Sequence, residues 1–174
     1  TLGDRGVIDK LKQVSDNNQL LMTSVEAIRR IGNKCTHTQE TGRITGQDVL
    51  DCIDCLFKMY ASIFVLYFKN YKFGGNNEVI SAFSILPPII RYLALNELHE
   101  QYPENLFVID KLSLVLLKAF DKEHAVSWIE ARKEKLVQTL PYTEGYSEQI
   151  KRQYGDILGQ QVIDRAPENM YVLC

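Results

Sequence analysis

The sequence predicts an all-α protein, and three observations lead to this fold class. Apolar residues recur every three or four positions along most of the chain, which is the spacing of one helix face. Strict alternation of apolar and polar residues, the pattern of half-buried strands, is scarce. The β-branched residues that favour strands are scattered. The length of 174 residues corresponds to one domain, or to one domain with a small appendage.

The first predicted elements are two short helices. Val7–Leu11 has the pattern of a short helical turn, and the polar run Asp16–Asn18 breaks it. Leu20–Arg30 is predicted to be helical because its apolar residues fall on one face. Ile31–Gly46 is rich in glycine, asparagine and threonine, which are poor helix formers, so we expect a long break there.

The strongest pattern is a long apolar helix over Gln47–Tyr71. Thr45 or Gly46 is the expected N-cap, and Asp48 lies in the first turn, where its charge favours the helix dipole. The most apolar stretch, Leu56–Phe68, is shorter than the roughly 20 residues that a membrane span needs. We therefore expect a buried core helix.

The second half of the chain predicts further helices. The segments are Glu78–Leu86, Ile89–Glu100, Glu104–Phe120, a helix capped by Asp121 that runs to about Leu140, and Ser147–Leu158. Turn residues at 73–77 separate the two halves. The first half has ten basic and eight acidic residues before Asn76, and the second half has ten basic and fourteen acidic residues after it. We expect a helical region at 1–75 and an extension at 76–174, which either stands apart or completes the same bundle.

The composition is that of an ordinary globular protein, with 45% hydrophobic and 24% charged residues. A net charge of −2 argues against a protein that coats nucleic acid through bulk charge, although it allows a local basic patch. Four cysteines without a secretory signal favour a reducing cytoplasm, and the missing initiator Met suggests a fragment of a longer protein. His99 and His124 are expected at the surfaces of helices.

The segment with chemical content is Ile28–His37. Arg29 and Arg30 close a helix, Gly32-Asn33 is expected to turn the chain, and His37 follows. Histidine exchanges a proton near neutral pH, and the arginine guanidinium binds phosphate oxygens as a fork. An Arg and a His on one face can cleave an RNA phosphodiester without a metal. The base takes the 2′-hydroxyl proton, the arginine stabilises the pentacoordinate charge, and a 2′,3′-cyclic phosphate forms.

This segment resembles the HEPN superfamily, in particular the branch found alone or near the N-terminus of type I restriction-enzyme R subunits. The resemblance rests on Ile28-Arg29-Arg30-Ile31-Gly32-Asn33 followed by His37 and by the apolar helix Val49–Phe68, and it covers about residues 2–71. It implies a helical bundle that forms a homodimer, with two Arg/His motifs facing one cleft. Many members are metal-independent endoribonucleases of toxin, restriction and antiviral defence systems.

Carried over to this chain, the resemblance implies His37 as the acid and base, Arg30 as the phosphate clamp and Asn33 as the orienting residue. In the compact form of the motif an arginine directly precedes the polar residue, and this chain has Gly32 at that position. An arginine from the preceding turn would have to act instead, so Arg29 is the alternative clamp to Arg30. Nucleic-acid contacts are expected from Arg29, Lys34 and Arg43. We expect no cofactor and no metal. RNA or another nucleic acid is the expected partner, and we expect the chain to belong to a larger restriction or defence complex.

Two interpretations without catalysis compete with the enzyme hypothesis. In the first, Asn33 and His37 only hold a turn through hydrogen bonds, and the chain is a non-catalytic module for dimerisation or for nucleotide or nucleic-acid binding. In the second, the chain is a helical adaptor whose second half binds a protein. Cys52 and Cys55 form a Cys-x-x-Cys pair that Cys35 and His37 would have to complete for zinc, so buried helix cysteines are the favoured interpretation.

Overall fold

The computed structural model describes residues 4–36, 43–71, 73–103 and 105–134, together with 148, 151–152, 155–157 and 159–160. Every regular element in these ranges is an α-helix and none is a strand, so the predicted all-α class is confirmed. The chain divides into two compact units, Thr1–Tyr71 and Lys72–Cys174. Within the described ranges, no helix is long and apolar enough to cross a membrane.

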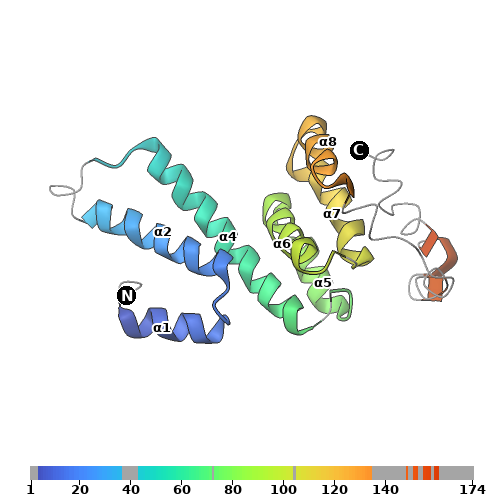
Figure 1. Ribbon diagram of the computed structural model, residues 1–174, viewed down its shortest axis with the longest axis horizontal. Helices are drawn as coiled ribbons and strands as arrows, with labels where there is room; N and C mark the ends of the chain where they lie inside the picture. Colours follow the sequence, from blue (N-terminus) through green and yellow to red (C-terminus); the bar gives the residue numbers. More distant parts are fainter. Residues whose placement is uncertain are drawn as a thin grey trace. The chain divides into compact units, whose positions relative to one another are not determined.

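The described part of the first unit consists of α1 (Arg5–Val14), α2 (Gln19–Thr36) and α4 (Gly46–Asn70). α4 runs back alongside α2, and this pair makes the main helix contact of the unit (Figure 1). The buried apolar side chains of these two helices are Leu21, Val25, Ile31, Ala61, Val65 and Phe68. The core of the unit is therefore small, and α4 contributes to it from its C-terminal half.

α1 is bounded by polar residues at both ends. The Asp4 carboxylate accepts a hydrogen bond from the amide of Gly6 at 2.8 Å, which caps the first turn. The helix ends where Asp16 and Asn17 take positive φ angles of 49° and 53°, a conformation that Asp and Asn adopt more readily than most residues. The predicted break is confirmed, whereas the helix is longer than the predicted Val7–Leu11.

The predicted break that starts at Ile31 is wrong, because α2 continues through Gly32 and Asn33 to Thr36. Ile31 is 7% exposed, and burial of such a side chain stabilises by about 1.5–3 kcal/mol. That exceeds the cost of about 1 kcal/mol for a glycine inside a helix. The expected turn at Gly32-Asn33 is a helical segment. Of the remaining break, 43–45 are non-helical and 37–42 lie outside the described residues.

α4 begins in a capping box. The Thr45 hydroxyl accepts a hydrogen bond from the amide of Asp48 at 3.2 Å, and the Asp48 carboxylate accepts one from the amide of Thr45 at 2.7 Å. Thr45 is therefore the cap, and Gly46 is the first helical residue. The predicted helix Gln47–Tyr71 is confirmed to within one residue at each end.

The expectation of a buried core helix holds for only one face of α4. A row of apolar residues on this helix is 42–59% exposed, and we name it the α4 stripe: Val49, Ile53, Leu56, Tyr60 and Ile63. Their spacing alternates four and three residues, so they lie along one seam of the helix. The exposed row therefore lies apart from the buried residues of the same helix.

The described part of the second unit contains α5 (Asn77–Ser84), α6 (Pro88–Gln101), α7 (Leu106–Ala119) and α8 (Lys122–Glu130). α7 packs against both α6 and α8. The predicted helices at these positions are confirmed, and Asp121 caps α8 by accepting a hydrogen bond from the amide of His124 at 2.8 Å. The fully buried large side chains include Leu95, Leu98, Ile109, Leu112, Leu116 and Ile129.

Two predictions in this unit need correction. α8 ends at Glu130 and the chain turns at Ala131 and Arg132, so the helix predicted to about Leu140 is interrupted there; Lys133 and Glu134 are helical again, and residues 135–140 lie outside the described ranges. His99, expected at the surface, is completely buried, and its ring lies 5.6 Å from that of Trp128 on α8. His124 is exposed, as expected. Of the predicted helix Ser147–Leu158, the few described residues are helical.

Candidate functional site

The continuous path of α2 brings most of the motif residues to one cavity. The cavity has a volume of about 560 Å³ and lies where the last turns of α2 meet the first turn of α4. Its lining residues are Glu26, Arg29, Arg30, Ile31, Asn33, Lys34 and Asp48. Residues three or four positions apart share a helix face, so the helix itself places the arginines beside Asn33 and Lys34. We name this feature the α2 cavity.

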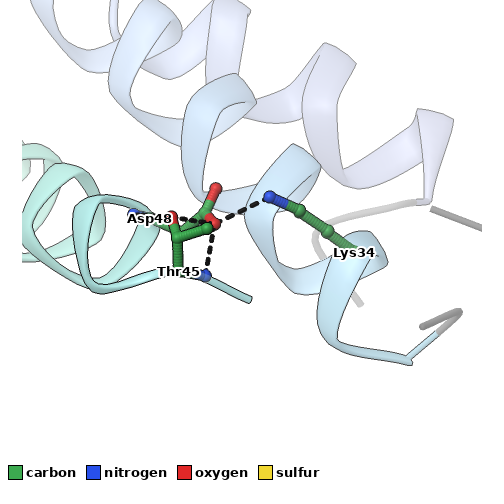
Figure 2. A network of polar contacts seen from close by, with 3 residues as sticks. All are labelled: Lys34, Thr45 and Asp48. Atoms are coloured by element: carbon green, nitrogen blue, oxygen red, sulfur yellow. Dashed lines mark hydrogen bonds and ion pairs between the residues drawn. The ribbon is translucent and has the colours of Figure 1, made fainter. Parts of the chain in front are cut away.

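Two residues that line the α2 cavity, Lys34 and Asp48, belong to a hydrogen-bonded network between the two helices (Figure 2). The Lys34 ammonium donates to the Asp48 carboxylate at 2.7 Å. The same carboxylate oxygen accepts hydrogen bonds from the amide and the hydroxyl of Thr45, each at 2.7 Å. The network therefore joins the C-terminal turn of α2 to the cap of α4.

These contacts fix the charge state of Asp48. The hydrogen bond from Lys34 and those from Thr45 hold the pKa of the Asp48 carboxyl well below its ordinary range. Asp48 is a carboxylate at neutral pH, with its accepting oxygen already engaged. It therefore offsets the charge of Lys34 and is not a proton acceptor for a ligand.

Unlike Lys34 and Asp48, the two arginines of the cavity are not joined to each other or to other described residues by polar contacts. Arg29 and Arg30 are exposed, and no ion pair or hydrogen bond joins either guanidinium to another residue that the structure describes. Because Lys34 is offset by Asp48, the charges left at the cavity are those of the arginines and Glu26. The excess is one positive charge, carried by groups that bind phosphate and carboxylate oxygens in fork geometry.

The structure places the six predicted site residues in three ways. Arg29, Arg30, Asn33 and Lys34 line the α2 cavity together. Arg43 is exposed and does not line it. His37, the predicted acid and base, lies outside the described residues.

Sequence reasoning did not predict the two acidic lining residues, Glu26 and Asp48, as parts of the site. The spacing carried a signal for both of them. Glu26 stands three and four residues before the arginines, which is one turn of a helix. Asp48 stands three residues after Thr45, which is the spacing of a capping box.

The cysteines do not assemble a metal site in the part of the chain that is described. Cys52 and Cys55 lie on α4 as half-buried free thiols, and Cys35 is an exposed free thiol near the end of α2. Burial raises the pKa of the Cys55 thiol, which disfavours the thiolate that binds metals. No group of three or more His, Cys, Asp or Glu side chains in the described ranges is placed to hold an ion.

Fold and site together define a helical protein with an arginine-lined cavity where two helices meet. Comparisons of the chain with family models, with curated proteins and with solved structures found no match.

Proposed function

We propose that the α2 cavity binds a phosphate group of RNA through Arg29 and Arg30. The observation that carries this proposal is that two arginines without a partner among the described residues line one cavity, while the neighbouring Lys34 is engaged by Asp48. A planar guanidinium donates two parallel hydrogen bonds to phosphate oxygens. The cavity volume of about 560 Å³ is within the range of small-molecule sites.

The proposal extends to cleavage, as the resemblance to HEPN domains implies. His37 takes the proton of the 2′-hydroxyl, and the 2′-oxygen attacks phosphorus. The protonated His37 then gives its proton to the departing 5′-oxygen, and the products are a 2′,3′-cyclic phosphate and a 5′-hydroxyl. Arg30, or Arg29, stabilises the charge on the pentacoordinate phosphorus, and Asn33 orients the phosphate.

A non-catalytic nucleic-acid-binding module is the second candidate. The observation that favours it concerns which of the described lining residues can act as a base. The hydrogen bonds from Lys34 and Thr45 lower the pKa of the Asp48 carboxyl, so Asp48 is a weak base. The proposed cleavage uses His37 as its base, whereas phosphate binding needs the arginines alone.

A binding experiment tests the shared part of both candidates. Fluorescence anisotropy with a short single-stranded RNA compares the unaltered chain with Arg29→Ala and Arg30→Ala. A charge-assisted hydrogen bond contributes about 1.5–3 kcal/mol, so each variant should bind about 10–100-fold more weakly. The slope of affinity against salt should also fall by about one for each arginine. Arg5→Ala, an exposed arginine on α1 outside the cavity, is the matched control.

Cleavage in EDTA separates the two candidates. The enzyme is supported by cyclic-phosphate ends that disappear in His37→Ala and Arg30→Ala variants with unchanged melting temperatures. RNA binding without cleavage supports the module. Equal binding by the arginine variants and by the control would contradict the site itself.

We further propose that the chain forms a homodimer through the α4 stripe. The stripe exposes five apolar residues over about two heptads, which is the seam that pairs helices in coiled coils. The spacing alternates three and four residues when read from either end. Two copies can therefore pair in antiparallel orientation without bringing a charged residue into the seam.

A further inference from the structure

Glu26 is the residue of the α2 cavity that phosphate binding does not explain. It is exposed, it lines the cavity with the two arginines, and its carboxylate has no ion pair or hydrogen bond with the residues that the structure describes. A carboxylate repels a phosphate ligand, so its place beside Arg29 and Arg30 opposes the proposed ligand. It fits a ligand that also presents N–H donors.

We propose that the α2 cavity takes a guanosine nucleotide, with Glu26 accepting hydrogen bonds from guanine while the arginines hold the phosphate. This inference rests on the proposed function and names the nucleotide at that site. The lining residues follow in order along α2, with Glu26 first, the arginines next, and Asn33 and Lys34 last. Arg29 and Arg30 stand three and four residues after Glu26, which is about 4.5–6 Å along the helix, and Lys34 stands eight residues after it, about 12 Å along. Because the arginine side chains are long, a nucleotide can lie over this face with its base toward Glu26 and its phosphate at the guanidinium groups.

Guanine is favoured by the chemistry of its Watson–Crick edge. Its N1–H and N2–H groups are two neighbouring donors, and they match the two oxygens of one carboxylate. Adenine and cytosine present one amino donor beside a ring-nitrogen acceptor, which a carboxylate repels. Uracil presents one N–H between two carbonyl oxygens, which is also unfavourable.

The other polar groups of the cavity cannot supply this selectivity. The amide of Asn33 offers both donors and acceptors, so it can pair with any base. One carboxylate oxygen of Asp48 accepts three hydrogen bonds from Lys34 and Thr45, so Asp48 lacks the two open oxygens that the paired donors of guanine require. Glu26 is therefore the acceptor that distinguishes bases.

The test measures binding of the four nucleoside 3′-monophosphates by isothermal titration calorimetry. The full-length chain should bind the guanosine nucleotide about tenfold or more tightly than the other three, as expected for one bidentate base contact. Glu26→Gln replaces one acceptor by a donor and should remove most of this preference. Asp9→Asn, an exposed acid-to-amide change on α1, is the matched control and should keep it.

Each other outcome overturns a defined part of the inference. Equal affinity for all four nucleotides, lost in Arg29→Ala and Arg30→Ala, would leave the phosphate site standing and overturn the guanine contact. A Glu26→Gln variant that binds all four more tightly, with the preference intact, would reduce Glu26 to a repulsive charge. No binding of any nucleotide would overturn the phosphate site and the guanine contact together.

Discussion

At the scale of single residues, the character of the α2 cavity depends on which charged groups are already engaged. Lys34 and Asp48 pair at 2.7 Å, so they serve the joint between α2 and α4. Arg29, Arg30 and Glu26 line the same cavity without such a pair among the described residues. The first pair is a structural contact, and the second group is the one available for a ligand.

Asp48 gives a prediction about pH. Its folded-state pKa lies below the ordinary value of 3.8, so its ionised form stabilises the fold above that pH, and the contribution is lost as the pH falls through the folded-state pKa. Asp48→Asn should therefore lower the melting temperature at pH 7, and the difference from the unaltered chain should narrow below about pH 3.8. Thermal melts at pH 7 and pH 3 measure this. Asp51→Asn, whose carboxylate accepts a hydrogen bond only from Gln47 among described residues, is the control. An equal difference at both pH values would show that the charge is not the cause.

Part of the candidate site could be predicted from the sequence. Arg29, Arg30, Asn33 and Lys34 were predicted from the motif, and the structure brings them to one cavity. Glu26 is not predicted as part of the site, although it lies with Arg29 and Arg30 inside the helix predicted over Leu20–Arg30, where a spacing of three and four residues places them on one face. Asp48 comes from another helix, and only the packing of α4 along α2 brings it there.

At the scale of the element, α2 shows that packing can outweigh the low helix propensity of a segment. The long helix α4 was predicted almost to the residue because its apolar pattern and its cap agree. The last turns of α2 were predicted as a break because glycine, asparagine and threonine are poor helix formers. The buried Ile31 outweighs that preference, and it stands three residues after Ile28, so it continues the apolar spacing of Leu21, Val25 and Ile28. The burial of His99 could not be predicted in this way, because tertiary packing decides it.

The destabilisation that Gly32 causes within α2 can be measured as a change in the free energy of unfolding. A Cβ at Gly32 would have no atom within 4 Å, so Gly32→Ala should stabilise the protein by about 0.5–1 kcal/mol. Gly74 is the contrasting position because its φ is +92°, so Gly74→Ala should destabilise by about 1 kcal/mol or more. Urea denaturation measures both changes. A destabilised Gly32→Ala variant would argue against a continuous helix at this position.

At the scale of the whole molecule, the two units bury their apolar residues to different degrees. In the second unit α7 lies against both α6 and α8, and Leu112 and Leu116 are completely buried. In the first unit, the α4 stripe leaves five large apolar side chains 42–59% exposed. A helix that is apolar on more than one face is typically covered on more than one face. The stripe is therefore the surface on which we have proposed that a second copy of the chain packs.

Sedimentation velocity tests this dimer with one substitution in the stripe. Ile53→Lys places a charge in the middle of the seam, where it would be desolvated by the second copy, and should shift the chain from dimer to monomer at micromolar concentration. Val14→Lys makes the same chemical change at an apolar residue that is 85% exposed on α1, and it should leave the dimer intact. A chain that is already monomeric without substitution would contradict the dimer. A dimer that survives Ile53→Lys would place the contact on another surface.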